Sequence, residues 1–184
     1  MQWIVVGLGN PGGEYVGTRH SVGRDFLEAL AQKLPPKTRV VLPDTFMNES
    51  GRALVKLVKS KKAAEGLVVL HDDLDLPLGS AKISFGSGSG GHKGVESIQK
   101  TLKTKDFVRI RIGISPTTPS GRIKKPSSAD VNDFVLGRFK PTEQEKLKKV
   151  RKVVAEALNI LLAEPPAPAE VARAAAMGAV NSKR

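Results

Sequence analysis

The sequence has no cysteine, few aromatic residues and no long apolar run. Without cysteine the 184-residue chain can form neither disulfides nor thiolate zinc sites, and it has no cysteine nucleophile. One Trp, one Tyr and six Phe are too few to stack on many single-stranded bases. No stretch approaches the ~18 apolar residues of a membrane span, and Met1 leads directly into an apolar strand pattern. We therefore expect a cytoplasmic protein with no signal peptide and no membrane contact.

Positive charge is what the sequence has in excess, with 30 Lys and Arg against 18 Asp and Glu. Residues 1–92 contain 11 basic and 9 acidic residues, whereas residues 93–184 contain 19 and 9. Between Lys93 and Lys125 nine basic residues face only two acidic ones, Glu96 and Asp106. Solvated lysines on a basic protein give the same count, but such a concentration favours a polyanionic partner. With so few aromatics, recognition of the backbone and shape of a folded nucleic acid fits better than base stacking.

Short β-branched runs alternate with segments of helical periodicity, which predicts an α/β sheet with helices on its faces. The expected strands are residues 3–8, 40–42, 67–70, 81–85 and 108–112. The expected helices are residues 22–34, 53–58, 95–102, a long helix opened by a Thr142–Glu145 capping box and ended by Pro165, and an alanine-rich helix reaching about Met177. We find no repeat and no linker long enough to separate two domains.

Gly7, Gly9 and Gly12 match the dinucleotide-binding fingerprint letter for letter. The context excludes that function, because a dinucleotide-binding turn opens a helix at once. Here Asn10-Pro11 and further glycines keep the chain in a loop.

Three histidines, His20, His71 and His92, are the candidates for acid–base chemistry. His20 lies in a loop that leaves the first strand, and Asp72 follows a later strand, so both fall near the carboxyl edge of the predicted sheet. A carboxylate bonded to an imidazole fixes its tautomer and strengthens it as a base. Taken alone, a histidine at such a place is more often a loop or capping residue than a catalyst. A metal site built from His20, His71 and the aspartates is conceivable, although no ligand-spacing motif supports it.

Hydrolysis by direct attack of water is the catalytic route that the residues leave open. No serine lies in a G-x-S-x-G elbow, and cysteine is absent. Direct attack needs a base and amide donors for the oxyanion, and Asn10 and Asn48 follow strands where they could donate. The simpler alternatives are that Asn10-Pro11 is a turn pair and that Asn48 caps a helix.

Several blocks of the chain, taken in order, resemble the bacterial-type peptidyl-tRNA hydrolase family. The blocks are Gly7–Gly12 (GLGNPG), Glu14-Tyr15, Thr18–Gly23 (TRHSVG), Phe46–Gly51 (FMNESG), His71–Gly79 (HDDLDLPLG), Gly90–Gly94 (GGHKG), Arg109–Ile114 (RIRIGI) and Phe134–Gly137 (FVLG). The resemblance implies a single domain over residues 1–184, weakly matched from about residue 165. It implies a three-layer αβα sandwich with a mixed, mostly parallel twisted sheet, working as a monomer without metal or cofactor.

The family resemblance also implies an activity, cleavage of the ester that joins a peptide to the 3′-terminal adenosine of tRNA, which recycles free tRNA. Carried over by position, His20 is the base that activates water and Asp72 raises its basicity. Asn10 and Asn48 hold the peptide and polarise the ester carbonyl. The implied substrate contacts are Tyr15, Phe46, Asn48, His92 and Lys93. The implied contacts to phosphates of the tRNA acceptor arm are Lys82, Arg109, Arg111, Lys100, Lys103 and Lys105.

The chain departs from the family pattern at three places. Lys93 stands where relatives usually carry an asparagine, and a charged lysine cannot accept a hydrogen bond. Ser84 replaces a common second phosphate-binding lysine, and the segment between Leu34 and Val40 is too short for the hairpin of longer relatives. Lys93 in particular keeps an alternative open, an RNA-binding homologue that has lost turnover.

Overall fold

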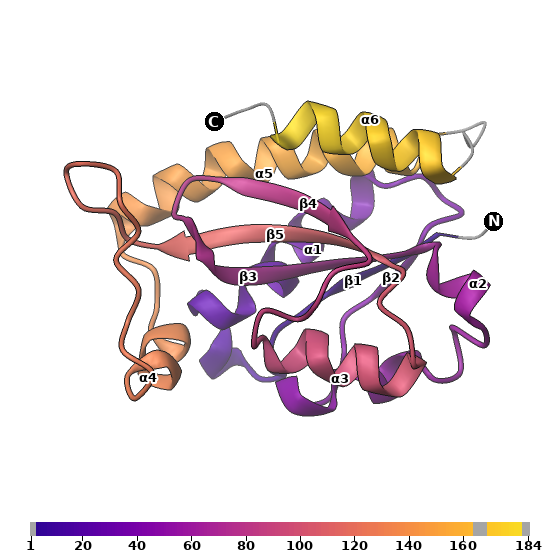
Figure 1. Ribbon diagram of the computed structural model, residues 1–184, viewed down its shortest axis with the longest axis horizontal. Helices are drawn as coiled ribbons and strands as arrows, with labels where there is room; N and C mark the ends of the chain where they lie inside the picture. The colour runs from indigo at the N-terminus through magenta and orange to yellow at the C-terminus, as the bar shows by residue number, and fades with distance from the viewer. Residues whose placement is uncertain (1–2, 164–168, 182–184) are drawn as a thin grey trace.

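The computed structural model describes residues 3–163 and 169–181, and its centre is one five-stranded sheet (Figure 1). The strands are β1 (Ile4–Gly7), β2 (Arg39–Val41), β3 (Leu67–Pro77), β4 (Ala81–Phe85) and β5 (Val108–Ser115). Their spatial order is β2-β1-β3-β5-β4, in which β4 pairs antiparallel with β5 and the other pairs are parallel. The expectation of a mixed, mostly parallel sheet in an α/β fold is confirmed.

Helices cover both faces of this sheet, which gives the expected three layers (Figure 1). One face packs on α1 (Val22–Leu30), α5 (Pro141–Leu161) and α6 (Ala169–Asn181). The other packs on the 3-10 helix η4 (Met47–Leu54), α2 (Lys61–Ala64) and α3 (Lys93–Leu102). Alternate strand residues such as Val5 and Val6 are fully buried in opposite layers, as a strand buried on both faces requires. Among the described helices, none combines the length and the apolar composition that crossing a membrane demands.

The backbone of α1 lies directly against β3 because the contact is made at a glycine. A Cβ atom at Gly23 would stand 2.2 Å from the carbonyl oxygen of Leu70. This close approach fixes the start of α1, and the short 3-10 helix η2 (Arg19–Ser21) immediately precedes it. The side chain of His20, in η2, is thereby set beside Asp72 of β3.

Local details differ from the sequence-based expectations at several elements. Strand β3 runs to Pro77 rather than ending at Leu70, because residues up to Asp73 pair with β5 and pairing resumes at Pro77 after an irregularity. The expected helix over 53–58 is instead η4, which begins at Met47. The other helices are η1 (Gly13–Tyr15), η3 (Ala31–Lys33) and α4 (Val131–Leu136).

The expected capping box at the start of the long helix is also wrong, by two residues. Helix α5 begins at Pro141, and the carboxylate of Glu143 accepts a hydrogen bond from the backbone N–H of Lys140 at 2.7 Å. Proline at the first helical position needs no N–H partner, which favours this earlier start over Thr142. Helix α6 extends to Asn181, beyond the expected Met177, and Pro165 lies outside the described residues.

Candidate active site

The candidate site lies where β1 ends beside β3, which continues past this point to Pro77. The chain leaves β1 toward β2 on one side and leaves β3 toward β4 and β5 on the other, so the two strands flank the point where the strand order reverses. Side chains that follow or end such strands converge in one crevice. Asn10 follows β1 directly, and His20 follows it through η1 and η2. Residues 8–21 form turns and 3-10 helices rather than an α-helix, which confirms that the glycine pattern here is no dinucleotide-binding turn.

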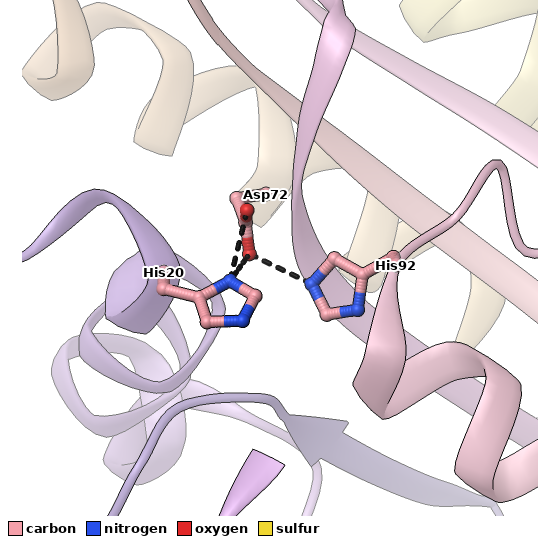
Figure 2. A group of neighbouring side chains, drawn as sticks. All are labelled: His20, Asp72 and His92. Carbon is pink, nitrogen blue, oxygen red and sulfur yellow. Dashed lines mark hydrogen bonds and ion pairs between the residues drawn. The ribbon is translucent and has the colours of Figure 1, made fainter. Parts of the chain in front are cut away.

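His20 and Asp72 form a hydrogen-bonded pair at this point (Figure 2). Nδ1 of His20 lies 2.9 Å and 3.1 Å from the two carboxylate oxygens of Asp72. The side chain of Asp72 is 3% exposed and that of His20 is 14% exposed. A carboxylate only accepts, so Nδ1 carries the hydrogen and Nε2 is the basic nitrogen. Within the described chain Nε2 of His20 has no hydrogen-bond partner, which leaves it available to a substrate or water.

His92 makes a second hydrogen bond to the same carboxylate (Figure 2). It is the N-cap of α3, where its Nδ1 accepts hydrogen bonds from the backbone N–H groups of Gly94 and Val95. Because Nδ1 accepts, the hydrogen is on Nε2, which donates to Oδ1 of Asp72 at 2.8 Å. The family resemblance implies that His92 contacts substrate. In the structure His92 makes a hydrogen bond that connects Asp72 to the start of α3.

The electrostatics of the pair favour a charged carboxylate and a strengthened base. Burial by itself lowers the pKa of His20, but the charge of Asp72 and the hydrogen bond to it outweigh this, so the pKa lies above its ordinary value. Burial would raise the pKa of Asp72, yet the two neighbouring imidazoles, His92 and His20, and their hydrogen bonds lower it well below its ordinary value. Asp72 is therefore ionised at neutral pH, and His20 holds a proton more firmly than a free imidazole.

His71 supports the site from inside the protein. Its side chain is 1% exposed, its Nδ1 donates to the backbone oxygen of Asp72 at 2.7 Å, and its ring lies 4.8 Å from that of His92. Burial lowers its pKa well below the ordinary value, and the neighbouring side chains of His92 and Arg109 lower it further. A neutral, buried His71 packs the site and has no access to a substrate.

Three of these side chains could also hold a metal ion. His20, Asp72 and His92 each offer one ligand atom, and the three atoms lie within 4.8 Å of one another. This set differs from the one that the sequence suggested, because His92 takes the place of His71. Without a metal, Asp72 is already satisfied by the N–H groups that His20 and His92 donate.

The first of two hollows beside His20 is a cavity of about 290 Å³, here called the Asn10 hollow. Its lining residues are Asn10, His20, Phe46, Met47, Asn48, Lys93, Asn132, Val135 and Leu136. Oδ1 of Asn10 accepts a hydrogen bond from the backbone N–H of Met47 at 2.8 Å, so its amide group is held with Nδ2 free to donate. Phe46 is 55% exposed, and its ring and that of Tyr15 pack in a T-shaped arrangement with their centroids 6.5 Å apart. Asn48 lies in η4 and caps no α-helix.

The second, the Gly90 hollow, is a cavity of about 270 Å³ that also borders His20. Its lining residues are His20, Asp72, Asp73, Leu74, Ser89, Gly90, Gly91, His92, Lys93, Val131, Asn132 and Val135. The two hollows share His20, Lys93, Asn132 and Val135. Sequence reasoning missed Asn132, which lies just before the Phe134–Gly137 block and belongs to no motif.

Arg19 joins α4 to the segment that carries His20. Its guanidinium pairs with Glu143 at 3.0 Å, donates to the backbone oxygen of Phe134 and lies 4.5 Å from the centre of the Phe134 ring. Its backbone N–H donates to the oxygen of Gly137 at 3.0 Å. These contacts hold Asn132 and Val135, both on α4, in place relative to His20.

The basic residues expected to meet phosphate fall into three environments. Lys82 and Arg111 are neighbours across β4 and β5, and Nε of Arg111 donates to Asp73, which lines the Gly90 hollow, at 2.6 Å. Arg109 is 4% exposed and donates to the hydroxyl of Ser87, so it is turned inward. The third group, at the far end of α3 from His92, is exposed and comprises Lys100, Lys103 and Lys105.

Comparison with known proteins identifies a family for this chain. The family model described as peptidyl-tRNA hydrolase matches the chain in two stretches, residues 4–39 and 35–181. The peptidyl-tRNA hydrolase of Syntrophotalea carbinolica is 40% identical over 179 residues, a match that covers 86% of this chain and 90% of the relative. That of Mycobacterium tuberculosis is 36% identical over 188 residues, covering 91% and 94%. The crystal structure of peptidyl-tRNA hydrolase from Acinetobacter baumannii is also similar, with a TM-score of 0.80, 31% identity, and coverage of 98% of this chain and 94% of that one.

Proposed function

Because the chain belongs to the peptidyl-tRNA hydrolase family, we propose that it hydrolyses the ester bond between a peptide and the 3′ end of tRNA. The observation that carries this proposal is the His20–Asp72 pair, in which His20 lines both hollows. We assign one hollow to each side of the scissile bond. The reaction is that of a carboxylic ester hydrolase. It returns a free peptide and a free tRNA.

His20 is the proposed general base. Nε2 takes a proton from water while the water oxygen bonds to the ester carbonyl carbon, which becomes tetrahedral. The imidazolium that forms lies 2.9 Å from the ionised Asp72, whose charge stabilises it. His20 then gives the proton to the ribose oxygen as the carbon–oxygen bond breaks. The step balances without a covalent intermediate, a metal or a cofactor.

The Asn10 hollow is proposed to take the peptide side of the substrate. Asn10 is held by Met47, so its Nδ2 is aimed without further ordering, and Asn48 lines the same hollow. Amide donors preset toward the developing oxyanion lower the barrier. The exposed ring of Phe46 lines the hollow and packs against the partly buried ring of Tyr15, an arrangement that suits contact with peptide side chains.

The Gly90 hollow and the strand edge next to it are proposed to take the 3′ end and acceptor arm of tRNA. Arg111 bonds to Asp73, which lines this hollow, and Arg111 is also the neighbour of Lys82 across the two strands. The positive charges of these two side chains are suited to binding phosphate. Lys100, Lys103 and Lys105 extend the positive surface along α3. Since Arg109 is turned inward, we assign it to holding Ser87 and the glycine-rich segment rather than phosphate. We propose that one copy of the chain, a monomer, contains the complete site.

Release of the acyl group from a purified N-acetyl-aminoacyl-tRNA tests this function. The protein is incubated with the tRNA labelled in the amino acid, and soluble label is counted against time. We expect many turnovers per protein molecule. Binding of the tRNA without release would contradict the proposal and support the RNA-binding alternative.

A further inference from the structure

Asn132 is a carboxamide at the boundary of both hollows with no role in the chemistry described so far. It is the second residue of α4, and it lines each hollow together with His20 and Lys93. Among the described residues its side chain has no hydrogen-bond partner. An amide at this place has both a donor and an acceptor to offer to whatever meets His20.

The attacking water needs a second acceptor besides His20. Water gives one hydrogen to Nε2 of His20 and keeps the other, which must be accepted by a group that holds the oxygen in line with the carbonyl carbon. Lys93, the charged neighbour of His20 in both hollows, can only donate. The acceptor must therefore come from elsewhere on the lining.

Most other polar side chains on the lining are already engaged. Oδ1 of Asn10 accepts from Met47. Asp72 accepts from two histidines, Asp73 accepts from Arg111 and the backbone of Asp75, and Ser89 accepts from the backbone of Gly91.

Asn48 and Asn132 remain as neutral acceptors. Asn48 lines only the Asn10 hollow, whereas Asn132 borders both hollows, as His20 does.

We propose that Asn132 is a catalytic residue whose Oδ1 accepts the second hydrogen of the attacking water and so orients that water for deprotonation by His20. The proposal rests on the proposed hydrolase function and adds to it the group that positions the nucleophile. Arg19 bonds to the backbone of α4 and adjoins His20 in the sequence, so base and acceptor are held by one cluster of contacts. The water is thereby oriented from α4, whereas Lys93 belongs to α3.

The test replaces Asn132 with alanine and asks whether a carboxamide on α3 restores what is lost. Asn132 is exposed and alanine is the better helix former, so the Asn132→Ala variant keeps its fold. We expect kcat for N-acetyl-aminoacyl-tRNA to fall about tenfold, the size of one neutral hydrogen bond, with KM nearly unchanged. Adding Lys93→Asn to this variant returns an acceptor to the boundary and is expected to recover most of the lost kcat. Asn159→Ala, an exposed asparagine on α5, is the matched control.

The outcomes separate the inference from the function on which it rests. If the unmodified protein releases no acyl group, the hydrolase function fails. If it is active and Asn132→Ala keeps its kcat, the water-orienting role fails alone. A loss in Asn132→Ala that Lys93→Asn does not repair, or that appears as a change in KM only, also overturns the assignment. A fall in kcat repaired by Lys93→Asn supports it, because a merely structural role of Asn132 would not respond to a residue on another helix.

Discussion

Replacing Asp72 with asparagine isolates the effect of its charge on His20, since the two side chains have nearly the same shape. In the structure both carboxylate oxygens lie within 3.1 Å of Nδ1 of His20, and Oδ1 also accepts from His92. The oxygen of an asparagine can still accept from both imidazoles. Asp72→Asn therefore keeps the shape of the side chain and removes the negative charge, while the NH2 group in place of Oδ2 cannot accept from Nδ1 of His20.

The expected magnitude follows from the causes that set the pKa of His20. Burial lowers that pKa, and the charge and hydrogen bond of Asp72 raise it by more. Without the charge, burial dominates, and an opposite charge at this distance is worth about 1–3 pKa units. The acid limb of kcat/KM should move to lower pH by about one unit or more. The rate at the plateau should fall about 100-fold, because a weaker base and an imidazolium without a counter-charge each cost about tenfold.

The assay is the pH dependence of kcat/KM for N-acetyl-aminoacyl-tRNA between about pH 5 and pH 8, the range over which histidine titrates. Asp75→Asn is the matched control, because Asp75 lies on the same strand but pairs with Lys125 at the surface. The control should keep the unmodified profile. An acid limb that stays in place in Asp72→Asn, or moves to higher pH, would refute the argument that Asp72 tunes His20.

The same substitution has a predicted effect on stability. The pKa of Asp72 is depressed in the folded state. Its contribution to the free energy of unfolding is therefore fully present above the pKa of the unfolded chain and is lost as the pH falls. The pKa of His20 is raised, so its contribution is present below the unfolded pKa and lost as pH rises through the folded value. The pair therefore stabilises most between about pH 4 and pH 6.5. Denaturant unfolding should show this maximum weakened in Asp72→Asn, and an identical pH profile of unfolding free energy would contradict the reasoning.

Two further predictions concern the tRNA surface and the packing under the site. Arg111→Gln and Lys82→Gln should each weaken tRNA binding and reduce the slope of log K against log salt by about 1. The control Lys61→Gln, on α2, should change neither. A slope equal to that of the unmodified protein would show that Arg111 and Lys82 do not touch phosphate. Gly23→Ala should lower the free energy of unfolding by about 1–3 kcal/mol, because its Cβ would collide with the backbone of β3. Gly13→Ala, with open space around its Cβ, should stay within about 0.5 kcal/mol, and equal effects of the two variants in denaturant melts would argue against the close contact.

The alternation of apolar runs predicts the strands well, because burial on both faces of a parallel sheet leaves continuous β-branched segments. The same pattern predicts that His20 and Asp72 lie near one edge of the sheet, although Asp72 lies within β3 rather than after it. The length of β3 could not be predicted in this way. Residues after Leu70 are mostly polar, and they extend because β5 supplies partners, which is a tertiary effect.

Other features depend on contacts between segments far apart in the sequence. The segment from Met47 forms a 3-10 helix packed closely on α3, where a Cβ atom at Gly51 would lie 2.5 Å from the backbone oxygen of Ser97. The bond from His92 to Asp72 depends on how α3 starts, and the place of Asn132 depends on Arg19 joining α4 to η2. None of these leaves a pattern within its own segment.

The most direct test of the central claim, that His20 is the base in ester hydrolysis, is the single-turnover rate of His20→Ala on N-acetyl-aminoacyl-tRNA, measured together with tRNA affinity. General base catalysis is worth about 10²–10⁴ in rate, so we expect a loss of that size with tRNA binding retained. A single-turnover rate equal to that of the unmodified protein would contradict the account.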